Sequence, residues 1–389
     1  MKIIHINCVY PVGSTGRLIE NIVKNCVRKG YESIVLYGRG AKCNKVEAIK
    51  VSSELEAKIH GLLSRLTGQW FSYSPASTAR IIRILKNEKP DVVHLHCLNA
   101  NFVNVYRLIG FLKKNKIKTV LTLHAEIMHT AGCEHAGECI KWQSGCHNCA
   151  KIKGMLTGYF RDDAKIAYNK IKKAFHGFEN LTVTSVSEWL TQRAESSNVF
   201  KHHEIRFCTI HNAVDTSKFR QPDLKHENRV PRILHITPNF NHPLKGGKYV
   251  LELAKIQPEW NFIIVGASCD NDSLPSNIQF IPHTNNQKEL ISYYQQADVT
   301  LLTSYRETFS MVCLESLACG TPVVGFKAGA PEQIFKEKYA EFVDFGNVEA
   351  LAIGIKHMLK ERPKIDSNYI EQNFSVTQMT SKYLKIYEK

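Results

Sequence analysis

The sequence predicts an α/β protein made of two Rossmann-like domains that face each other across a deep interdomain cleft. Three observations support this fold class: a length of 389 residues, two runs of alternating apolar and amphipathic segments, and a polar stretch between them. A chain of this length exceeds one ordinary core and suits two domains of roughly 150–200 residues. Short buried strands that alternate with helices indicate parallel sheets covered on both faces.

The first domain is predicted to comprise residues 1–215. Its strands are expected at Ile3–Ile6, Ser33–Tyr37, Val92–His96, Thr119–Leu123 and Leu181–Val186. Amphipathic stretches separate these runs, as crossover helices do between parallel strands. His5 and Asn7 make the opening segment too polar for the apolar core of a signal peptide. We therefore expect a buried first strand there.

The second domain is predicted to comprise residues 216–372, beginning with a polar linker that ends near Pro231. Its strands are expected at Arg232–Ile236, Asn261–Gly266, Ile278–Ile281, Val299–Thr303, Pro322–Gly325 and Glu341–Val343, and its helices at Gly247–Lys255, Gln287–Gln296 and Ser310–Cys319. Residues 373–389 are predicted to form a closing helix that packs back on the first domain, because Met379, Tyr383 and Tyr387 recur at helical spacing.

Basic residues concentrate in the first half of the chain. Residues 1–200 hold 29 lysines and arginines against 15 aspartates and glutamates, whereas residues 201–389 hold 22 against 21. Solvated helix faces would account for runs such as 113–118 and 170–173, and so would a surface for anionic lipid or a phosphate-bearing acceptor. No apolar run is long enough for a membrane helix. We expect a cytoplasmic protein, with peripheral association at the inner face of the plasma membrane.

The segment after the strand expected at Val299–Thr303 carries the most chemical information. Glu307 lies in a loop, Ser310 suits the N-cap of the following helix, and Glu315 lies within that helix. A helix start offers backbone N–H groups and a positive dipole end to a diphosphate. Glu315 could present its carboxylate to the two hydroxyls of a ribose. By themselves, two glutamates eight positions apart favour the alternative, an ordinary exposed helix.

The surrounding residues resemble glycosyltransferase family 4, which has the GT-B fold. The family's E-x₇-E element and its ending appear here as residues 307–324, and further matching segments lie at 90–96, 211–215, 245–247 and 298–299. The matches follow the family order over almost the whole chain. The resemblance implies a retaining glycosyltransferase that moves a sugar from a nucleoside-diphosphate sugar of the UDP or GDP type. The acceptor would be a saccharide or a polyprenyl-diphosphate-linked oligosaccharide in bacterial capsule, exopolysaccharide or O-antigen synthesis. The family generally needs no metal for catalysis.

The resemblance also implies a role for each matching residue of the second domain. Glu315 would bind the nucleotide ribose, and Glu307 would lie near the transferred sugar. Backbone amides of four consecutive residues would contact the sugar and phosphates, namely Thr308, Phe309, Ser310 and Met311. Lys245 would neutralise the diphosphate, which gains negative charge as the glycosidic bond breaks.

One position departs from the family pattern. The family commonly has an arginine about six residues before the lysine, whereas residues 238–244 of this chain contain none. Asn239 stands in its place and cannot supply charge. Arg306 and Arg17 are candidates for the missing cation.

In the first domain, Gly13 and Gly16 lie in a turn that follows the first strand and opens a helix. Such a turn allows the backbone close approach to a phosphate or to another element, and by itself it is a weak signal. The family has a glycine-containing loop here on the acceptor side of the donor. His124 follows the strand at Thr119–Leu123 and matches a family histidine near the transferred sugar. Without the resemblance, a lone histidine there would more often be structural.

The segment at residues 129–150 is an insertion rich in cysteine. Four of the twelve cysteines lie within 17 residues, at Cys133, Cys139, Cys146 and Cys149. In a chain without a secretion signal this clustering favours a structural zinc site over disulfides, although the spacing is looser than a paired C-x₂-C framework. The segment is similar to an insertion in a colanic-acid-type exopolysaccharide subgroup. Its place after His124 suggests that it shapes the acceptor side.

Two other functions remain compatible with parts of the sequence. A nucleotide-sugar epimerase of GT-B fold would share the architecture and need no acceptor. A basic zinc-containing nucleic-acid-binding protein would use the positive charge, although the basic residues are not interleaved with aromatic ones. The Asp270-Asn271-Asp272 triplet spells a metal-binding D-x-D but is interpreted as a turn, and no dinucleotide fingerprint follows the first strand.

Overall fold

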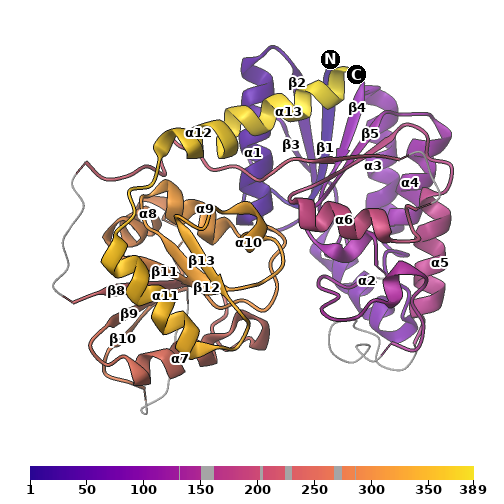
Figure 1. Ribbon diagram of the computed structural model, residues 1–389. Helices are drawn as coiled ribbons and strands as arrows, with labels where there is room; N and C mark the ends of the chain where they lie inside the picture. The colour runs from indigo at the N-terminus through magenta and orange to yellow at the C-terminus, as the bar shows by residue number, and fades with distance from the viewer. Residues whose placement is uncertain (131, 150–161, 202–204, 224–229, 267–273, 285) are drawn as a thin grey trace. The chain divides into compact units, whose positions relative to one another are not determined.

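The computed structural model describes residues 1–130, 132–149, 162–201, 205–223, 230–266, 274–284 and 286–389. The chain divides into two compact units (Figure 1). The first unit comprises Met1–His211 together with Met379–Lys389, and the second comprises Asn212–Gln378. The division after His211 lies a few residues before the boundary expected after residue 215. The Asp270–Asp272 triplet falls outside the described residues.

The first unit contains a seven-stranded parallel sheet in the order β3-β2-β1-β4-β5-β6-β7. Its strands are β1 (Lys2–Val9), β2 (Glu32–Arg39), β3 (Ala48–Lys50), β4 (Val92–Leu95), β5 (Thr119–Leu123), β6 (Leu181–Ser185) and β7 (Arg206–Thr209). Its helices are α1 (Gly13–Arg28), α2 (Glu54–Thr67), α3 (Pro75–Glu88), α4 (Val105–Lys114), α5 (Ala164–Phe175) and α6 (Glu188–Ser196), with short 3₁₀ turns η1 (Glu126–Met128) and η2 (Lys141–Gln143).

All five strands predicted for this unit are present, and the sequence reasoning missed β3 and β7. Both missed strands form the edges of the sheet. None of the residues in β3 is fully buried, and β7 begins with the exposed Arg206. An edge strand that packs little of its surface lacks the continuous apolar run by which a central parallel strand is recognised.

The second unit contains a six-stranded parallel sheet in the order β10-β9-β8-β11-β12-β13. Its strands are β8 (Arg232–Ile236), β9 (Asn261–Val265), β10 (Ile278–Ile281), β11 (Val299–Leu302), β12 (Val323–Phe326) and β13 (Ala340–Val343). Its helices are η3 (Pro243–Lys245), α7 (Gly247–Ile256), α8 (Gln287–Gln296), α9 (Met311–Ala318), α10 (Pro331–Ile334), α11 (Val348–Glu361) and α12 (Ser367–Phe374). Every strand and helix predicted for this part of the chain is confirmed.

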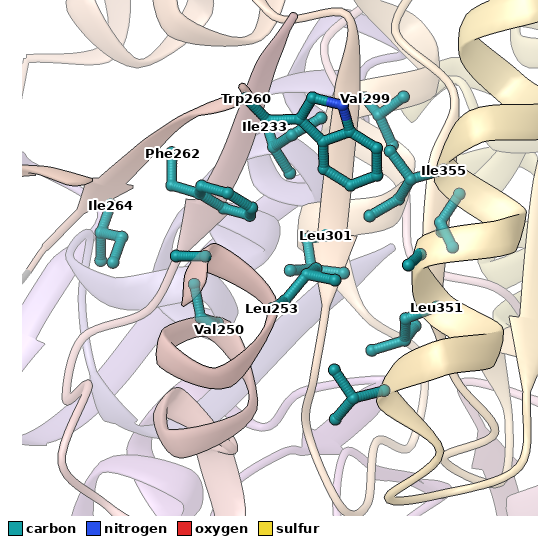
Figure 2. Packing of buried hydrophobic residues seen from close by; sticks show 14 of the residues in the cluster. Ile233, Val250, Leu253, Trp260, Phe262, Ile264, Val299, Leu301, Leu351 and Ile355 are labelled. Atoms are coloured by element: carbon teal, nitrogen blue, oxygen red, sulfur yellow. The ribbon is translucent and has the colours of Figure 1, made fainter. Parts of the chain in front are cut away.

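One face of the second sheet is held by a dense apolar core, which Figure 2 shows from close by. Val250 and Leu253 of α7 and Leu351 and Ile355 of α11 are fully buried against the central strands. Trp260 lies at the edge of the same cluster. Burying such side chains stabilises a fold by roughly 1.5–3 kcal/mol each. The core therefore fixes the strand ends from which the site loops emerge.

The last helix, α13 (Val376–Glu388), packs on the first unit through polar contacts as well as apolar ones. The Tyr387 hydroxyl lies 2.6 Å from Nδ1 of His94, and the Tyr383 hydroxyl lies 3.2 Å from Oγ1 of Thr122. Lys118 donates to the Tyr387 carbonyl at 2.6 Å. These contacts give the helix one register against the sheet. In the described residues, no helix is both long and apolar enough to cross a membrane.

Candidate active site

Each sheet reverses its strand order at one point, and parallel α/β sheets bind ligands at the carboxyl ends of the strands beside that point. In the first unit the reversal lies between β1 and β4, and in the second between β8 and β11. We call these the first and second switch points. Lys245 and Glu307 follow β8 and β11, and Gly13 follows β1, whereas His124 follows β5, the strand next to β4.

At the second switch point, Lys245 and Glu307 form an ion pair with 2.9 Å between Nζ and Oε1. Their side chains are 33% and 20% exposed, so water reaches both. A partly exposed pair contributes little to folding, typically about 0–1 kcal/mol. The pair is better suited to ligand binding than to stabilising the fold. An anionic ligand can contact the Lys245 ammonium group without exposing a deeply buried charge.

The loop that carries Lys245 is joined to the loop after β11. Thr303 Oγ1 donates to the Lys245 carbonyl at 2.8 Å, and the Tyr305 amide donates to the Leu244 carbonyl at 2.9 Å. Gly246 has φ +69°, and a Cβ there would lie 2.2 Å from the Thr303 carbonyl oxygen. A side chain at this position would force the two loops apart. The glycine after the lysine is therefore required by packing.

Glu307 is positioned from the opposite side by the loop after β12. Its amide donates to the Ala328 carbonyl at 2.9 Å, and its carbonyl accepts from the Ala330 amide at 3.3 Å. Arg306, a candidate for the missing cation, stacks with its guanidinium carbon 5.2 Å from the Tyr305 ring centre. Asn239 lies in the loop after β8, and its side chain is exposed to solvent.

The start of α9 has the geometry of an anion-binding helix end. Ser310 is the N-cap as predicted, because its Oγ accepts from the Cys313 amide at 3.3 Å. Thr308, Phe309 and Ser310 are all buried, and the Phe309 ring packs against Phe335. Ser310 adopts φ +73°, a backbone conformation that few non-glycine residues take. First-turn amides, including that of Met311, lack carbonyl partners within their own helix.

Glu315 lies further along α9 and is oriented by a buried tyrosine. The Tyr294 hydroxyl donates to Oε2 of Glu315 at 3.0 Å, and Tyr294 is fully buried. Burial and the nearby carboxylate raise the pKa of Tyr294 well above its usual value. The phenol therefore remains a donor at any physiological pH. Sequence reasoning missed Tyr294, since nothing in α8 marks one tyrosine as a partner of Glu315.

A pocket of about 490 Å³ lies beside this charged group in the second unit. Leu244 and Gly246, which flank Lys245, line it together with the aromatic side chains of Tyr249, Tyr305 and Phe345. Aromatic walls beside a cation suit a ligand that has both a flat or apolar part and an anionic part. Nothing in the sequence marks these aromatic residues as neighbours, because Tyr249 lies on α7 and the other two lie in the loops after β11 and β13.

At the first switch point, the glycine turn brings α1 close to β1. Gly13 opens α1 with φ +70°. Gly16 is buried, and a Cβ there would lie 3.2 Å from the Val9 carbonyl oxygen. Gly16 therefore serves close helix–strand packing, while Gly13 supplies the turn. Arg17, the other candidate cation, is half-buried on α1.

His124 ends a hydrogen-bonded row of three histidines in the first unit. Its Nε2 lies 3.3 Å from Nδ1 of His96, whose Nε2 lies 3.2 Å from Nδ1 of His5. Burial lowers the pKa of His124 to about 4 and that of His5 to about 3, and it also lowers the pKa of His96 well below the usual value. All three rings are therefore neutral near pH 7.

A row of neutral imidazoles has coupled proton positions. Each neutral ring has one N–H donor and one acceptor nitrogen, so both hydrogen bonds can form only if the protons point the same way along the row. The tautomer of His124 is thereby tied to those of His96 and His5. The sequence could not show this row, because it depends on parallel register, in which His5 of β1 lies opposite His94 of β4.

The same histidines raise the question of a metal. Among the residues that the structure describes, His5, His94 and His96 form the one set of three or more ligand side chains with all ligand atoms within 4.8 Å. However, His94 has Tyr387 Oη 2.6 Å from Nδ1 and Thr122 Oγ1 2.6 Å from Nε2. These contacts favour a hydrogen-bond network over a metal centre.

The cysteine-rich segment begins beside His124 and is anchored by a buried acid. Glu126 is fully buried, accepts from the Ala136 amide at 2.8 Å and pairs with Nη2 of Arg193 at 2.6 Å. Burial would raise the pKa of Glu126, but His129 and Arg193 lower it to about 2. Sequence reasoning missed this anchor.

The four cysteines of that segment differ in burial: Cys133 is buried, and Cys139, Cys146 and Cys149 are half-buried. In the described part of the chain they form no set of three ligand atoms within 4.8 Å of one another. Zinc binding by these cysteines stays a prediction.

Two family models match the chain, one over most of the first unit and one over most of the second. Residues 15–218 match the model described as Glycosyltransferase Family 4, and residues 225–375 match that of Glycosyl transferases group 1. An N-acetyl-alpha-D-glucosaminyl L-malate synthase from Bacillus anthracis is 23% identical over 92% of this chain and 87% of its own length. A putative colanic acid biosynthesis glycosyl transferase from Escherichia coli is 19% identical over 87% of this chain and 86% of its own.

Solved structures share the fold at low sequence identity. A glycosyltransferase from Rickettsia africae superposes with a TM-score of 0.69 at 18% identity, over 100% of this chain and 97% of its own. The HepE protein of Anabaena, in complex with UDP, gives 0.66 at 14% identity over 100% of both chains. The two parallel-sheet units are thus those of the GT-B glycosyltransferases. The Glycosyltransferase Family 4 model matches about half of the chain, residues 15–218. The chain therefore belongs to glycosyltransferase family 4.

Proposed function

We propose that this glycosyltransferase moves a sugar from a nucleoside-diphosphate sugar to a saccharide or lipid-linked oligosaccharide with retention of anomeric configuration. The observation that carries the proposal is the second switch point, where Lys245, Glu307 and the start of α9 lie on adjoining loops while Tyr294 orients Glu315. A cation beside a helix N-terminus suits a diphosphate, and an oriented carboxylate suits a ribose. The Anabaena protein of the same fold is bound to UDP, which supports a UDP-type donor.

The chemistry of the step follows from these groups. The bond between the anomeric carbon and the diphosphate oxygen breaks, and the acceptor hydroxyl oxygen bonds to the same face of that carbon. The hydroxyl proton passes to the departing diphosphate. Lys245 and the first amides of α9 stabilise the negative charge that grows on the leaving group, so they favour the transition state over the bound donor. Catalysis by these residues requires no metal, so transfer should not depend on added divalent cations.

The first unit supplies the acceptor side in this proposal. Neutral His124 can form a hydrogen bond to a sugar hydroxyl, and its tautomer is coupled to those of the row behind it. The excess of basic residues in this half suits a polyprenyl-diphosphate-linked acceptor at the inner face of the plasma membrane. The similarity to the putative colanic acid transferase supports a role in bacterial surface-polysaccharide synthesis.

A thermal-shift panel of UDP-, GDP- and ADP-sugars tests the donor part of the proposal. A ligand that binds the native state raises the melting temperature by mass action. We expect one nucleotide class to stabilise the protein, and Lys245→Ala and Glu315→Gln to abolish most of that shift. Lys255→Ala, an exposed lysine on α7, serves as the matched control. If no nucleotide sugar stabilises the wild-type protein, the proposal is wrong.

Product analysis separates the two enzymatic readings. With donor alone, a transferase leaves the sugar's configuration unchanged, whereas an epimerase releases an epimerised donor. With acceptor present, the configuration of the new linkage reports retention. Binding to nucleic acid without donor-induced stabilisation would favour the non-enzymatic alternative.

A further inference from the structure

Helix α2 of the first unit exposes its large apolar side chains. Leu55, Ile59, Leu62 and Leu66 are 68%, 50%, 56% and 45% exposed. At about 100° per residue, these four positions fall within an arc of roughly 60° on the helix surface. Single exposed apolar residues are ordinary on protein surfaces, but a continuous stripe is not. We call these four residues the α2 stripe.

The opposite face of α2, which packs on the unit, is small and polar. Its buried residues are Ala57, His60 and Ser64. His60 Nδ1 lies 2.7 Å from Ser74 Oγ, and a side chain at Gly61 would meet Asn101. The helix is thus inverted relative to an ordinary surface helix, which buries its apolar stripe against the core. Packing against the described residues of this unit therefore does not account for the apolar side chains of the stripe.

Both ends of α2 are capped. Ser53 Oγ accepts from the Glu56 amide at 3.1 Å at the N-terminus, and Gly68 ends the helix at φ +67°. The N-cap hydrogen bond contributes about 1 kcal/mol. The stripe is consequently presented on a fixed helix within the first unit.

The charges around the stripe are complementary to an anionic surface. The two acidic residues of α2 are occupied within the unit: Glu54 pairs with Arg39 at 2.9 Å, and Glu56 accepts from the Ser77 amide at 3.1 Å. The basic residues Lys58 and Arg65 are exposed along one side of the stripe. A helix with an apolar stripe edged by cations is the pattern that lies in the interface of an anionic bilayer.

We infer that the α2 stripe inserts into the headgroup region of an anionic membrane and holds the first unit at the lipid surface. The inference rests on the proposed function, because it names the element that performs the membrane association proposed there. The surplus of 14 positive charges in residues 1–200 adds long-range attraction to anionic lipid, and the stripe adds apolar burial. An acceptor carried by a lipid would then reach the first unit by diffusion within the membrane.

Flotation of the full-length protein with vesicles of phosphatidylglycerol and phosphatidylcholine in equal amounts tests the inference. We expect the wild type to float with these vesicles and to bind phosphatidylcholine alone much less. The double variant Ile59→Gln, Leu62→Gln should lose at least about tenfold of its apparent partition, since each removed apolar side chain lowers insertion. The matched control is Ile256→Gln, Ile353→Gln, which changes two exposed isoleucines of the second unit and should bind as the wild type does.

A second variant tests insertion directly. Leu62→Trp places an indole in the stripe, and we expect its fluorescence to be quenched by vesicles with brominated acyl chains. Lys58→Glu with Arg65→Glu should weaken flotation and reduce its sensitivity to salt, because screening weakens only the electrostatic attraction. All these positions are on the surface, so the melting temperature should stay close to that of the wild type.

The outcomes distinguish this inference from the proposed function. If the stripe variant floats as well as the wild type, or the wild type does not float at all, the inference is overturned. Loss of self-association by the stripe variant, without a change in flotation, would assign the stripe to a protein contact instead and would also overturn it. Donor-induced stabilisation should be equal in the wild type and the stripe variant. If donor binding fails in both while flotation depends on the stripe, the transferase proposal fails and the membrane inference stands.

Discussion

The two switch points have the same strand order around them, but one carries charged side chains and the other carries neutral ones. The second carries a partly exposed ion pair, Lys245 with Glu307, next to the start of a helix. The first lies beside a row of buried and half-buried imidazoles that are neutral near pH 7. One arrangement suits a ligand that gains charge during reaction, and the other suits a neutral hydroxyl. Under the proposed function, the transfer reaction would therefore use a charged half in the second unit and a neutral half in the first.

The largest effect is expected from removing the cation of the charged half. Lys245→Ala should lower kcat/KM for sugar transfer roughly 10²–10³-fold, the usual loss when a group that stabilises developing negative charge is removed. Transfer is measured by chromatography of the glycosylated product. Lys255→Ala should leave the rate unchanged. If the Lys245→Ala enzyme had a normal rate, Lys245 would not stabilise charge at the second switch point, and the proposed difference between the two switch points would be wrong.

The next effect should come from interrupting the neutral row. His96→Phe removes the ring that ties the tautomer of His124, and we expect kcat to fall roughly 10–100-fold. Donor-induced stabilisation should not change, because the second unit is untouched. His96→Gln offers one donor and one acceptor and should restore part of the rate.

A control separates positioning from packing in that experiment. His176→Asn changes an exposed histidine of the same unit and should have no effect on kcat. If His96→Phe and His96→Gln lose activity equally, the hydrogen-bonded row does not position His124, and His96 serves packing alone.

A smaller effect is expected at the ribose side of the charged half. Tyr294→Phe removes the 3.0 Å hydrogen bond to Glu315 without changing the ring. A hydrogen bond to a charged group contributes about 1.5–3 kcal/mol, so donor affinity should fall roughly tenfold or more. The variant Tyr293→Phe, one position away on α8, is the control. Equal donor dissociation constants in calorimetry for both variants would show that Glu315 needs no orientation.

The sequence predicted the charged half better than the neutral half, for a physical reason. Lys245 and Glu307 each follow an apolar strand and lie in a local motif, so their positions can be recognised one segment at a time. The histidine row joins β1 to the residues that directly follow β4 and β5, and its contacts depend on strand register across about 90 residues of chain. The role of Tyr294 could not be predicted from the sequence either, since its partner Glu315 lies on another helix.

The fold follows the same rule. Central parallel strands are continuous apolar runs and were all predicted, whereas the edge strands β3 and β7 carry exposed or half-buried residues. The α2 stripe illustrates a related limit: helical spacing of apolar residues shows which of them share a face, but not whether that face is buried.

The smallest effect is expected in the pH dependence of stability, and it compares the two halves directly. Burial lowers the pKa of His5 to about 3 and of His124 to about 4. The unfolded chain, with histidine pKa values near 6.5, therefore binds more protons than the native state below that pH. The free energy of unfolding should be highest above about pH 6.5 and should decrease as the pH falls toward 4.

His5→Phe tests this dependence, because phenylalanine fills similar space and binds no proton. Each buried histidine contributes a slope of roughly 1 kcal/mol per pH unit in that window. In urea titrations between pH 6.5 and 5, the variant should show a slope smaller by about that amount. This range lies above the titration of Glu126, whose pKa is about 2. Lys245→Ala should leave the slope unchanged, since a lysine stays protonated in both states there. If both variants change the slope alike, the division into a charged and a neutral half does not hold.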